Sequence, residues 1–557
     1  MDYKIIKRRS NIQLNEESIV SIANQFHISE LSASLLMKKG LSTIGQIEEY
    51  LFPKKEYLHN PYLFRDMDKT VARILNAIRN QEQIVIYGDY DCDGICSSVI
   101  LFDTLSYLGG HVITFLPDRF VDGYGMNITR MKQLIQQGAQ LIITVDNGIV
   151  AFDEVEYANR RQVDVIITDH HTPDVKLPEA FSILNPKITY DSYPYEELCG
   201  AGVALKLAEA LLNENLPNEL LVLACIATIA DIVPLTGENR TITSIGLELL
   251  PKSNNVGLNE LISLAGLNIQ AITSGTISFQ IAPRINAAGR LYSAADAFKL
   301  LTTKDPQEAR EIAEKLEQAN NERKNIEETL FNEAESTILT GISKNRNVIF
   351  INIKDAHEGV IGIVAGKICE KYNRPTIVCS ESNSLIKASA RSIQGINIHD
   401  LLAHGYDLYE KFGGHSQAAG FSISTEKYPI LVERIEQEAE GLSNSFFKSA
   451  YYDLEAVSSQ LSEKAVSELN LFAPYGMKNP HPVYLLRGAA VRNISRMGSK
   501  KEHLRANIVH KNCNFQSVGF FMGDLADAFF QVNNTYDILF TPSINTYKQK
   551  RTLQLEI

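Results

Sequence analysis

The sequence predicts an α/β protein with a buried parallel sheet, a long connecting helix, a second α/β domain and a small C-terminal β-barrel. In the first half of the chain, short Val- and Ile-rich runs alternate with amphipathic segments, the pattern of a parallel sheet covered by helices. Residues 448–557 carry only short strand-like runs, which favours a barrel. With 557 residues, the chain exceeds a single core, and several domains of about 100–200 residues each are expected.

The predicted parallel sheet lies within residues 51–303, which form the expected catalytic domain. The runs 84–87, 141–145 and 163–168 are rich in Val and Ile, and helix-like segments separate them. Strands that are buried on both faces have this composition. Residues 1–50 are predicted to be an N-terminal helical segment.

A connecting helix is predicted for residues 304–345. The stretch from Pro306 to Leu339 is charged and helix-periodic, with no internal Gly or Pro, and at ~1.5 Å per residue it would span roughly 50 Å. No strict heptad persists, so a coiled coil is not expected. A second α/β domain is predicted for residues 346–447, starting at the strand-like run 347–353.

The last predicted domain, residues 448–557, contains five short strand-like segments. A small closed barrel is the usual solution for so few short strands, and an OB-fold that binds nucleic acid is the expected form. The segments are 483–494, 503–511, 514–521, 536–544 and 552–557.

Composition narrows the class of protein without deciding its function. The net charge of −12 argues against nonspecific coating of nucleic acid but permits a local basic groove. The seven cysteines form no CxxC pair, which favours reduced thiols and a cytoplasmic location. No apolar run approaches the roughly 20 residues of a membrane helix, and no signal peptide is evident, so no membrane association is expected.

An acidic stretch follows the first predicted strand. Asp89, Asp91 and Asp93 alternate before Gly94, as in the opening of an EF-hand calcium loop. The twelfth position of such a loop should be a bidentate glutamate, but here it is Ile100, and the preceding run is strand-like rather than helical. The calcium loop is therefore rejected.

Acidic and imidazole side chains follow three predicted strands in succession. The carboxyl ends of parallel strands are where open α/β sheets build their sites. One aspartate at a strand end is usually a cap or a turn residue, but three clusters at three strand ends are hard to explain by capping. The residues are Asp89, Asp91, Asp93, Asp146, Asp169, His170 and His171, and Asp231 could join them from the end of an apolar helix-like segment.

Such a concentration of carboxylates is tolerable only around cations, because buried like charges repel one another and lose hydration. Mixed carboxylate and imidazole ligands suit Mn²⁺ better than Mg²⁺, although Mg²⁺ often substitutes. Two divalent ions about 3.5–4 Å apart can activate water and neutralise a phosphoryl oxygen. The sequence therefore predicts a catalytic metal site for phosphoester hydrolysis.

The motifs around these residues resemble those of the DHH phosphoesterase superfamily. DYDCDG (89–94), VDNG (145–148) and TDHH (168–171) are similar to its motifs I, III and IV, and DRFVDGYGMN (118–127) is similar to motif II. Further segments resemble the RecJ family of single-strand-specific exonucleases, and the resemblance runs from about residue 50 to the end. They are LNPK (184–187), CGAGVALKL (199–207), ADIVPL (230–235), PRINAAGRL (283–291), GVIGIVAGKI (359–368), ASARS (388–392), FGGHSQAAGF (412–421) and APYGMKNPHPVYLLRG (473–488).

The resemblance implies a role for each candidate ligand. Two divalent ions, preferably Mn²⁺ with Mg²⁺ as a substitute, are expected. Asp89 and Asp91 would hold one ion, and Asp146 would bridge the two. The other ion would be held by Asp93, His170 and Asp231. The implied catalytic residues are Asp91, Asp146 and His171, of which His171 would contact the scissile phosphate or assist proton transfer.

The resemblance also implies which residues face DNA. Arg284, Ser389 and Arg391 would form a pocket for a 5′-phosphate, since arginine forks suit phosphates. Arg119 and Tyr124 would guide the strand, with Tyr124 stacking on a base. The other implied nucleic-acid-binding residues are Asn286, Arg290, Gln318, Arg323, Gly413, Gly414 and His415. The GVIGIVAG run lacks G-x-G-x-x-G spacing, so NAD binding is rejected.

The function implied is a single-stranded-DNA-specific 5′-to-3′ exonuclease that releases 5′-mononucleotides in DNA repair and recombination. A monomer is expected, and family habit implies a single-strand-binding protein and a helicase as partners. A DHH-family oligoribonuclease or cyclic-dinucleotide phosphodiesterase would share every metal ligand but has little use for an OB module. A non-catalytic DNA-binding replication scaffold would be expected to have lost these ligands.

Overall fold

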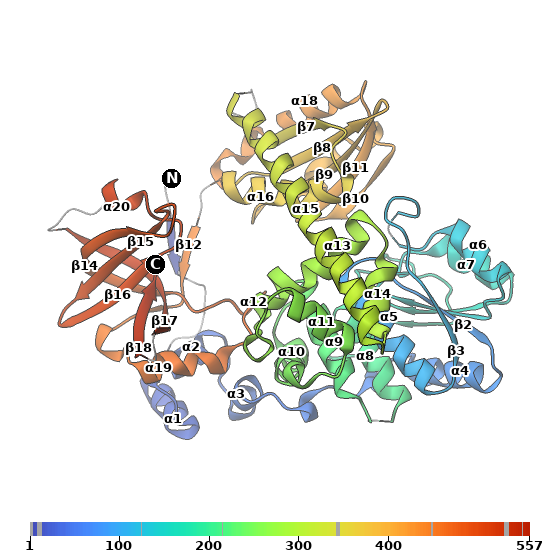
Figure 1. The fold of residues 1–557 in the computed structure, drawn as a ribbon, viewed down its shortest axis with the longest axis horizontal. Helices are drawn as coiled ribbons and strands as arrows, with labels where there is room; N and C mark the ends of the chain where they lie inside the picture. The colour runs from blue at the N-terminus through green and yellow to red at the C-terminus, as the bar shows by residue number, and fades with distance from the viewer. Residues whose placement is uncertain are drawn as a thin grey trace.

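The computed structural model describes residues 4–7, 14–123, 125–213, 215–340, 346–446, 449–528, 534–547 and 550–557. Figure 1 shows two α/β domains joined by one long helix, with a barrel to one side. The fold class predicted from the sequence is confirmed. No helix in the described ranges is long and apolar enough to cross a bilayer.

The first α/β domain contains the predicted sheet, and all five of its strands are parallel, in the order β3-β2-β4-β5-β6. The strands are β2 (Gln83–Tyr87), β3 (His111–Phe115), β4 (Leu141–Val145), β5 (Asp164–Thr168) and β6 (Ser182–Leu184). The helices are α4 (Met67–Arg79), α5 (Cys92–Tyr107), α6 (Ile128–Gln136), α7 (Phe152–Arg160), α8 (Gly200–Leu211), α9 (Asn218–Ala230), α10 (Gly237–Leu249), α11 (Val256–Leu264), α12 (Ser274–Thr276), α13 (Ala282–Leu291) and α14 (Ala294–Thr302).

Both faces of this sheet are buried, as its composition predicts. Successive side chains of a strand point to opposite faces. In β2, Ile84 and Ile86 join the core made with α5, α8 and α9, whereas Val85 and Tyr87 join the core made with α6 and α7. Because helices cover both faces, a functional site is expected at the carboxyl edge of the sheet, where open α/β sheets build their sites.

The connecting helix α15 (Pro306–Thr340) belongs to both α/β domains. In its first half, Ile312 and Leu316 pack into the core of the first domain. In its second half, Leu330 and Ile338 pack into a core of the second domain. A continuous helix packed at both ends fixes the spacing between the domains, and Figure 1 shows this helix running from one domain to the other.

The second α/β domain has a mixed sheet with the order β10-β11-β9-β8-β7. Only β7 and β8 pair in parallel, and the other neighbours are antiparallel. Its elements are β7 (Ile349–Lys354), α16 (Glu358–Tyr372), β8 (Thr376–Ser382), β9 (Leu385–Arg391), α17 (Ile398–Ala403), β10 (Lys411–His415), β11 (Ala418–Ser424) and α18 (Tyr428–Glu438).

The C-terminal domain is a closed barrel, because β17 pairs with β18 on one side and with β14 on the other. All five predicted strand segments are found. The elements are β12 (Ser449–Tyr452), β13 (Leu454–Glu455), α19 (Glu463–Ser467), β14 (Tyr484–Met497), β15 (His503–His510), β16 (Cys513–Gly519), α20 (Leu525–Ala528), β17 (Thr535–Tyr547) and β18 (Lys550–Glu556).

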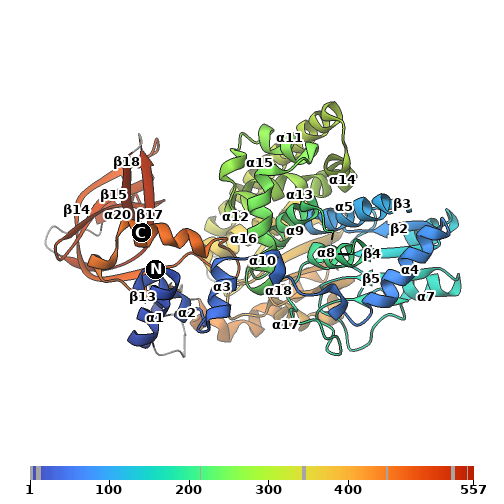
Figure 2. The same ribbon diagram turned by 90° about the horizontal axis from the view of Figure 1, so that it is seen from below.

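The N-terminal segment packs against this barrel rather than standing alone. Helices α1 (Glu16–Phe26), α2 (Glu30–Lys38) and α3 (Ile44–Leu51) share one hydrophobic core with the barrel strands, and Figure 2 shows α1 and α2 beside it. The Glu468 carboxylate accepts hydrogen bonds from the Ser29 N–H and from the Ser29 and Ser32 hydroxyls. The predicted N-terminal segment, residues 1–50, therefore packs together with the C-terminal barrel although the two are far apart in the sequence. The remaining strand, β1 (Lys4–Lys7), pairs in parallel with β12.

One arginine joins the barrel and the N-terminal helices to the first α/β domain. Arg240, on α10, donates hydrogen bonds to the carbonyls of Tyr50, Leu471, Phe472 and Ala473. Its guanidinium also stacks 3.8 Å from the centre of the Tyr50 ring. Since Arg240 is only 2% exposed, these contacts satisfy a charge that is otherwise costly to bury.

Candidate active site

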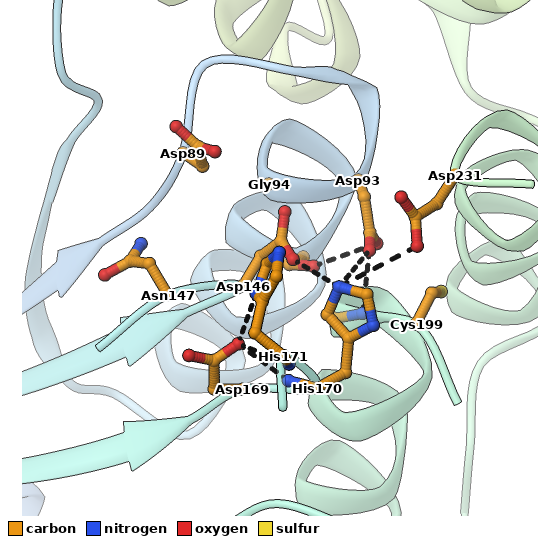
Figure 3. Close-up of polar contacts among 12 residues, drawn as sticks. Asp89, Asp93, Gly94, Asp146, Asn147, Asp169, His170, His171, Cys199 and Asp231 are labelled. Carbon is orange, nitrogen blue, oxygen red and sulfur yellow. Dashed lines mark hydrogen bonds and ion pairs between the residues drawn. The ribbon is translucent and has the colours of Figure 1, made fainter. Parts of the chain in front are cut away.

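The three clusters predicted at strand ends meet at the carboxyl edge of the parallel sheet. Asp89, Asp93, Asp146 and His170 are all less than a tenth exposed. Figure 3 shows Asp93, Asp231 and His170 turned toward one another. The Nε2 atom of His170 lies 3.1 Å from Asp146 Oδ1, 3.7 Å from Asp231 Oδ2 and 3.9 Å from Asp93 Oδ2.

Helix N-termini orient two of these carboxylates. Asp91 caps α5, and its Oδ1 accepts hydrogen bonds from the N–H groups of Asp93 and Gly94, each at 3.0 Å. Asp93 accepts from the N–H groups of Gly200 and Ala201 at the start of α8, each at 2.7 Å. Helix N-termini favour negative charge, so these contacts offset part of the cost of placing the two carboxylates here.

Asp146 is held in an unusual backbone conformation. Its φ of 62° is left-handed, which is uncommon for a residue other than glycine. Its Oδ1 is buried and accepts no hydrogen bond from the described part of the chain. A Cβ at Gly200 would lie 2.6 Å from the Asp146 Cβ, so α8 can start here only with glycine. The geometry aims an unsatisfied carboxylate oxygen into the cluster.

Three overlapping sets of potential metal ligands result, each with its ligand atoms within 4.8 Å of one another. One contains Asp89, Asp91 and Asp146, and a second contains Asp93, His170 and Asp231. The third combines Asp146 with both histidines. Asp146 and His170 each appear in two of the three sets, but only Asp146 shares one set with Asp89 and Asp91 and another with His170, so it is the residue best placed to serve two ions.

Without cations, these carboxyl groups are poorly accommodated as anions. Burial, followed by the charge of Asp91, raises the pKa of Asp89 to about 8 and that of Asp93 to about 6. Burial and neighbouring carboxylates also hold the pKa values of Asp146 and Asp231 well above the usual range. Burial lowers the pKa of His170 to about 3, so this imidazole is neutral and able to act as a ligand. This donor set fits divalent cations.

We expect the metal-free protein to become more stable as the pH falls from about 8 to about 6.5. A group whose pKa is higher in the folded state binds more protons there, so its contribution is lost as the pH rises. The raised pKa of Asp89, about 8, lies at the top of this range, and His171, whose pKa is raised to about 9, contributes in the same sense. Below about pH 6.5, the ordinary pKa of histidine, His170 takes up a proton in the unfolded state but not in the folded state. Its contribution therefore makes the folded protein less stable as the pH falls further.

Thermal unfolding in a chelator across this pH range would measure the trend, and saturating Mn²⁺ should abolish or reverse it. A melting temperature in chelator that rises between pH 6.5 and pH 8 would contradict the electrostatic account.

His171 lies beside the metal-ligand cluster on the groove side. Its Nδ1 is 2.7 Å from Asp169 Oδ1, and the other Asp169 oxygen accepts from the Ile149 N–H at 2.9 Å. Burial alone would lower the pKa of His171, but the Asp169 carboxylate raises it to about 9. His171 is therefore cationic at neutral pH and can hold an anionic oxygen or donate a proton.

A groove of about 960 Å³ runs between the two α/β domains and reaches His171. It is mainly basic, since its one acidic residue, Glu358, pairs with Lys387 at 2.8 Å. The basic residues and histidines that line it are Arg119, His171, Lys187, Lys387, Arg391, Lys411 and His415. An acidic protein thus presents a local cationic channel.

Six of the predicted DNA-facing residues line this groove: Arg119, Ser389, Arg391, Gly413, Gly414 and His415. Arg391 donates to the Ser389 hydroxyl at 3.0 Å. A Cβ at Gly362 of α16 would lie 2.9 Å from that hydroxyl oxygen and 3.0 Å from the Arg391 Nη2. The helix therefore approaches this pair closely and leaves room for it only because residue 362 is glycine.

Arg290 belongs to a cationic cluster with Arg119, Arg323 and Arg391. Burial, and then the charges of Arg119 and Arg323, lower its pKa to about 10, and Arg391 contributes as well. Arg323 pairs with Glu327 at 2.6 Å, but its buried Nε has no hydrogen-bond partner among the described residues. Arginines crowded in this way are stabilised by an anion.

Other predicted residues lie elsewhere. Arg284 pairs with Glu317 of α15 through Nε and Nη2, so Arg290, not Arg284, accompanies Arg391. Gln318 lines a separate hollow with Tyr292. Asn286 accepts a hydrogen bond from the Cys92 N–H at 2.7 Å, so it supports the DYDCDG loop. Tyr124 lies outside the described residues.

Sequence reasoning missed several groove residues. Lys187, Lys411, Phe120 and Phe412 line the groove but were not singled out. Lys187 stands in the LNPK motif, which contributed to the family resemblance without suggesting a role. Phe120 and Phe412 likewise stand in the DRFVDGYGMN and FGGHSQAAGF motifs. Lys411 carries no local signal, because a surface lysine is ordinary until the domains are placed together.

Three family models match the chain in its domain order. "DHH family, N-terminal domain" matches residues 83–228, "DHHA1 domain" matches residues 345–441, and "RecJ OB domain" matches residues 452–557.

Curated relatives are similar to this chain over most of its length. The single-stranded-DNA-specific exonuclease RecJ of Bacillus subtilis is 38% identical over 99% of this chain and 70% of its own length. The Escherichia coli protein of the same name is 34% identical over 75% of this chain and 77% of its own.

Solved structures agree. The crystal structure of Thermus thermophilus RecJ with Mn²⁺ matches with a TM-score of 0.85 and 28% identity, covering 100% of this chain and 78% of that one. A manganese-bound exonuclease RecJ is 34% identical, with a TM-score of 0.60 over 68% of this chain and 95% of that one. From these matches together, the chain belongs to the RecJ family of DHH proteins.

Proposed function

We propose that this protein is a metal-dependent exonuclease that degrades single-stranded DNA from the 5′ end and releases 5′-mononucleotides. The observation that carries the proposal is the buried carboxylate and imidazole cluster at one side of a basic groove. Its relatives in B. subtilis and E. coli are named single-stranded-DNA-specific exonucleases. A role in DNA repair and recombination follows from the family.

Two divalent ions, Mn²⁺ or Mg²⁺, fit the ligand sets, and T. thermophilus RecJ has been crystallised with each. Asp89 and Asp91 would hold one ion, and Asp93, His170 and Asp231 the other, with Asp146 shared. When bound, such ions supply Lewis acidity and lower the pKa of water. The raised carboxyl pKa values are the reason to expect cations at this position.

The protein's own residues would position the strand. Ser389, Arg391 and Arg290 are proposed to bind the terminal 5′-phosphate, which would set the polarity of digestion. His171, held cationic by Asp169, would contact the scissile phosphate and provide a proton to the departing 3′-oxygen. Arg119 lies over the Tyr90 ring, 5.4 Å from its centre, and would contact the backbone of the strand.

The experiment that tests the function is product analysis with 5′- and 3′-labelled single strands in Mn²⁺, with a chelator control. Mononucleotides released only from the 5′ end are expected, together with little digestion of duplex. Faster turnover of dinucleotides than of long strands would instead favour a short-substrate hydrolase. Binding without metal-dependent cleavage would favour a scaffold. We also propose that the protein is a monomer located in the cytoplasm, with a single-strand-binding protein and a helicase as its partners. Each of these proposals needs its own test.

Arg391→Ala is expected to reduce the preference for a 5′-phosphate over a 5′-hydroxyl end. Hydrogen bonds to charged groups contribute about 1.5–3 kcal/mol, so the preference should fall about 10- to 100-fold. Arg290→Ala should act in the same direction. The ratio of kcat/KM for the two kinds of end measures the effect.

Arg284→Ala is the matched control, because that guanidinium pairs with Glu317, and it should keep the preference. The opposite pattern, in which Arg284→Ala loses the preference and Arg290→Ala keeps it, would contradict the placement of the pocket.

A further inference from the structure

The fifth strand of the parallel sheet also delivers a polar group to the active-site edge. Strand β6 ends at Leu184, and Asn185, Pro186 and Lys187 follow it. Strand β6 pairs in parallel with β5, so its carboxyl end lies beside the end that carries His170 and His171. Neither the proposed metal ligands nor the proposed terminal-phosphate pocket uses Lys187.

Asn185 fixes Lys187 relative to His171. The Asn185 side chain is fully buried. Its Nδ2 donates to the His171 carbonyl at 2.9 Å, and its Oδ1 accepts from the Lys187 N–H at 2.9 Å. One buried amide therefore ties the backbone of the two residues together, which is how a site residue is held in a reproducible position.

The Lys187 side chain lines the groove together with His171 and Thr172. No carboxylate in the described part of the chain forms an ion pair with it, whereas Lys387 in the same groove pairs with Glu358. The charge of Lys187 acts on the side chains of Asp231 and His170. Lys187 is thus a cation near the candidate metal ligands that has no ion-pair partner in the described part of the chain.

The order of the groups along the groove suggests what this cation binds. Arg391 lines the groove, and the terminal phosphate is proposed to bind at this arginine and Arg290. His415 lines the same groove; burial lowers its pKa, and it is close enough to both Arg391 and His171 for their charges to lower that pKa further. Lys187 lies on the His171 side of the groove and is linked to His171 through Asn185. A strand with its 5′ end at Arg391 would present the next phosphates to this region.

We propose that Lys187 binds the backbone phosphate immediately 3′ of the scissile one. This inference rests on the proposed exonuclease function. The contact would hold the strand on the far side of the bond being cut, so that the scissile phosphate is fixed from both directions. An ammonium binds phosphate as a point charge and imposes no base preference.

The test pairs protein variants with substrates that carry one neutral linkage. A 5′-phosphorylated oligothymidylate receives a methylphosphonate at the second or the third internucleotide linkage, and release of the first nucleotide is measured in a single turnover with Mn²⁺. A neutral second linkage should slow the wild type about 10-fold or more, the loss expected for a charged hydrogen bond. Lys187→Gln should be about as slow on the normal strand and no slower on the modified one.

The controls separate a direct contact from a general defect. Lys132→Gln removes the same charge from an exposed position on α6 in the same domain and should behave as the wild type. Lys187→Arg should retain most of the sensitivity to the second linkage. If Lys187→Gln does not fold, the scan of linkages on the wild type alone decides, because an unaffected second linkage overturns the inference.

The inference would also be overturned if Lys187→Gln slowed digestion of the strand with the neutral second linkage by the same factor as it slows digestion of the normal strand. It would be overturned as well if the variant lost sensitivity to the third linkage instead of the second. A wild type that digests no single strand would overturn the proposed function, which is a different outcome from digestion without a second-linkage effect.

Discussion

Replacing Asp146 by alanine is expected to lower the rate of Mn²⁺-dependent digestion of single strands by at least about 1,000-fold. Metal ions at such sites contribute several kcal/mol to transition-state stabilisation, and about 1.4 kcal/mol corresponds to a factor of ten. Asp146 shares one ligand set with Asp89 and Asp91 and another with His170, so its loss would weaken both proposed ions. Rates measured across a range of Mn²⁺ concentrations would show whether added metal restores activity.

Strand binding should survive this change, because the cationic groove and the barrel do not depend on Asp146. Binding can be measured by fluorescence anisotropy with labelled single strands in a chelator. Asp153→Ala, an exposed position on α7, is the matched control and should retain full activity. If Asp146→Ala remained within tenfold of the wild type, Asp146 would not be the shared ligand.

Gly200→Ala is expected to impair the enzyme almost as severely without removing any ligand. The new Cβ would lie 2.6 Å from the Asp146 Cβ and 2.8 Å from its Oδ1, so either α8 or Asp146 must move. Since Gly200 and Ala201 also donate to Asp93, a shift of α8 disturbs both ligand sets. We expect at least about a 100-fold loss of activity, and overpacking should cost about 1–3 kcal/mol of stability.

Gly366→Ala is the matched control, because it lies in α16 and its added Cβ would meet no atom within 4 Å. Alanine should raise the stability by up to about 1 kcal/mol, through its better helix propensity, and leave the activity unchanged. Thermal unfolding and single-strand digestion measure both variants. Equal activity of the two glycine variants would show that α8 does not position the metal ligands.

Most of the proposed metal ligands could be predicted from sequence because they follow short strands that are easy to recognise, whereas Asp231 follows the apolar helix α9. The runs before Asp89, Asp146 and His170 are continuous and apolar, and parallel strands bring their carboxyl ends to one edge. The carboxyl end of β6 was harder to see, since Ser182–Leu184 is only three residues long. Lys187 was overlooked for that reason.

The cationic cluster shows a second limit of sequence reasoning. Arg284 and Arg290 stand in one motif, and both are arginines on α13. Which of them meets Arg391 depends on the face of α13 that turns toward the second domain and on the position of Glu317 on α15. Contacts between domains leave no periodic pattern in the sequence, so this choice required the structure.

The core shared by the N-terminal helices and the barrel has a consequence for how the chain folds during translation. Ser29 and its partner Glu468 are 439 residues apart, and ribosomes add about 5–20 residues per second. Helices α1–α3 must therefore wait tens of seconds, with their apolar faces uncovered, before their partner is made. Over that interval they lack the barrel strands that cover them in the folded protein.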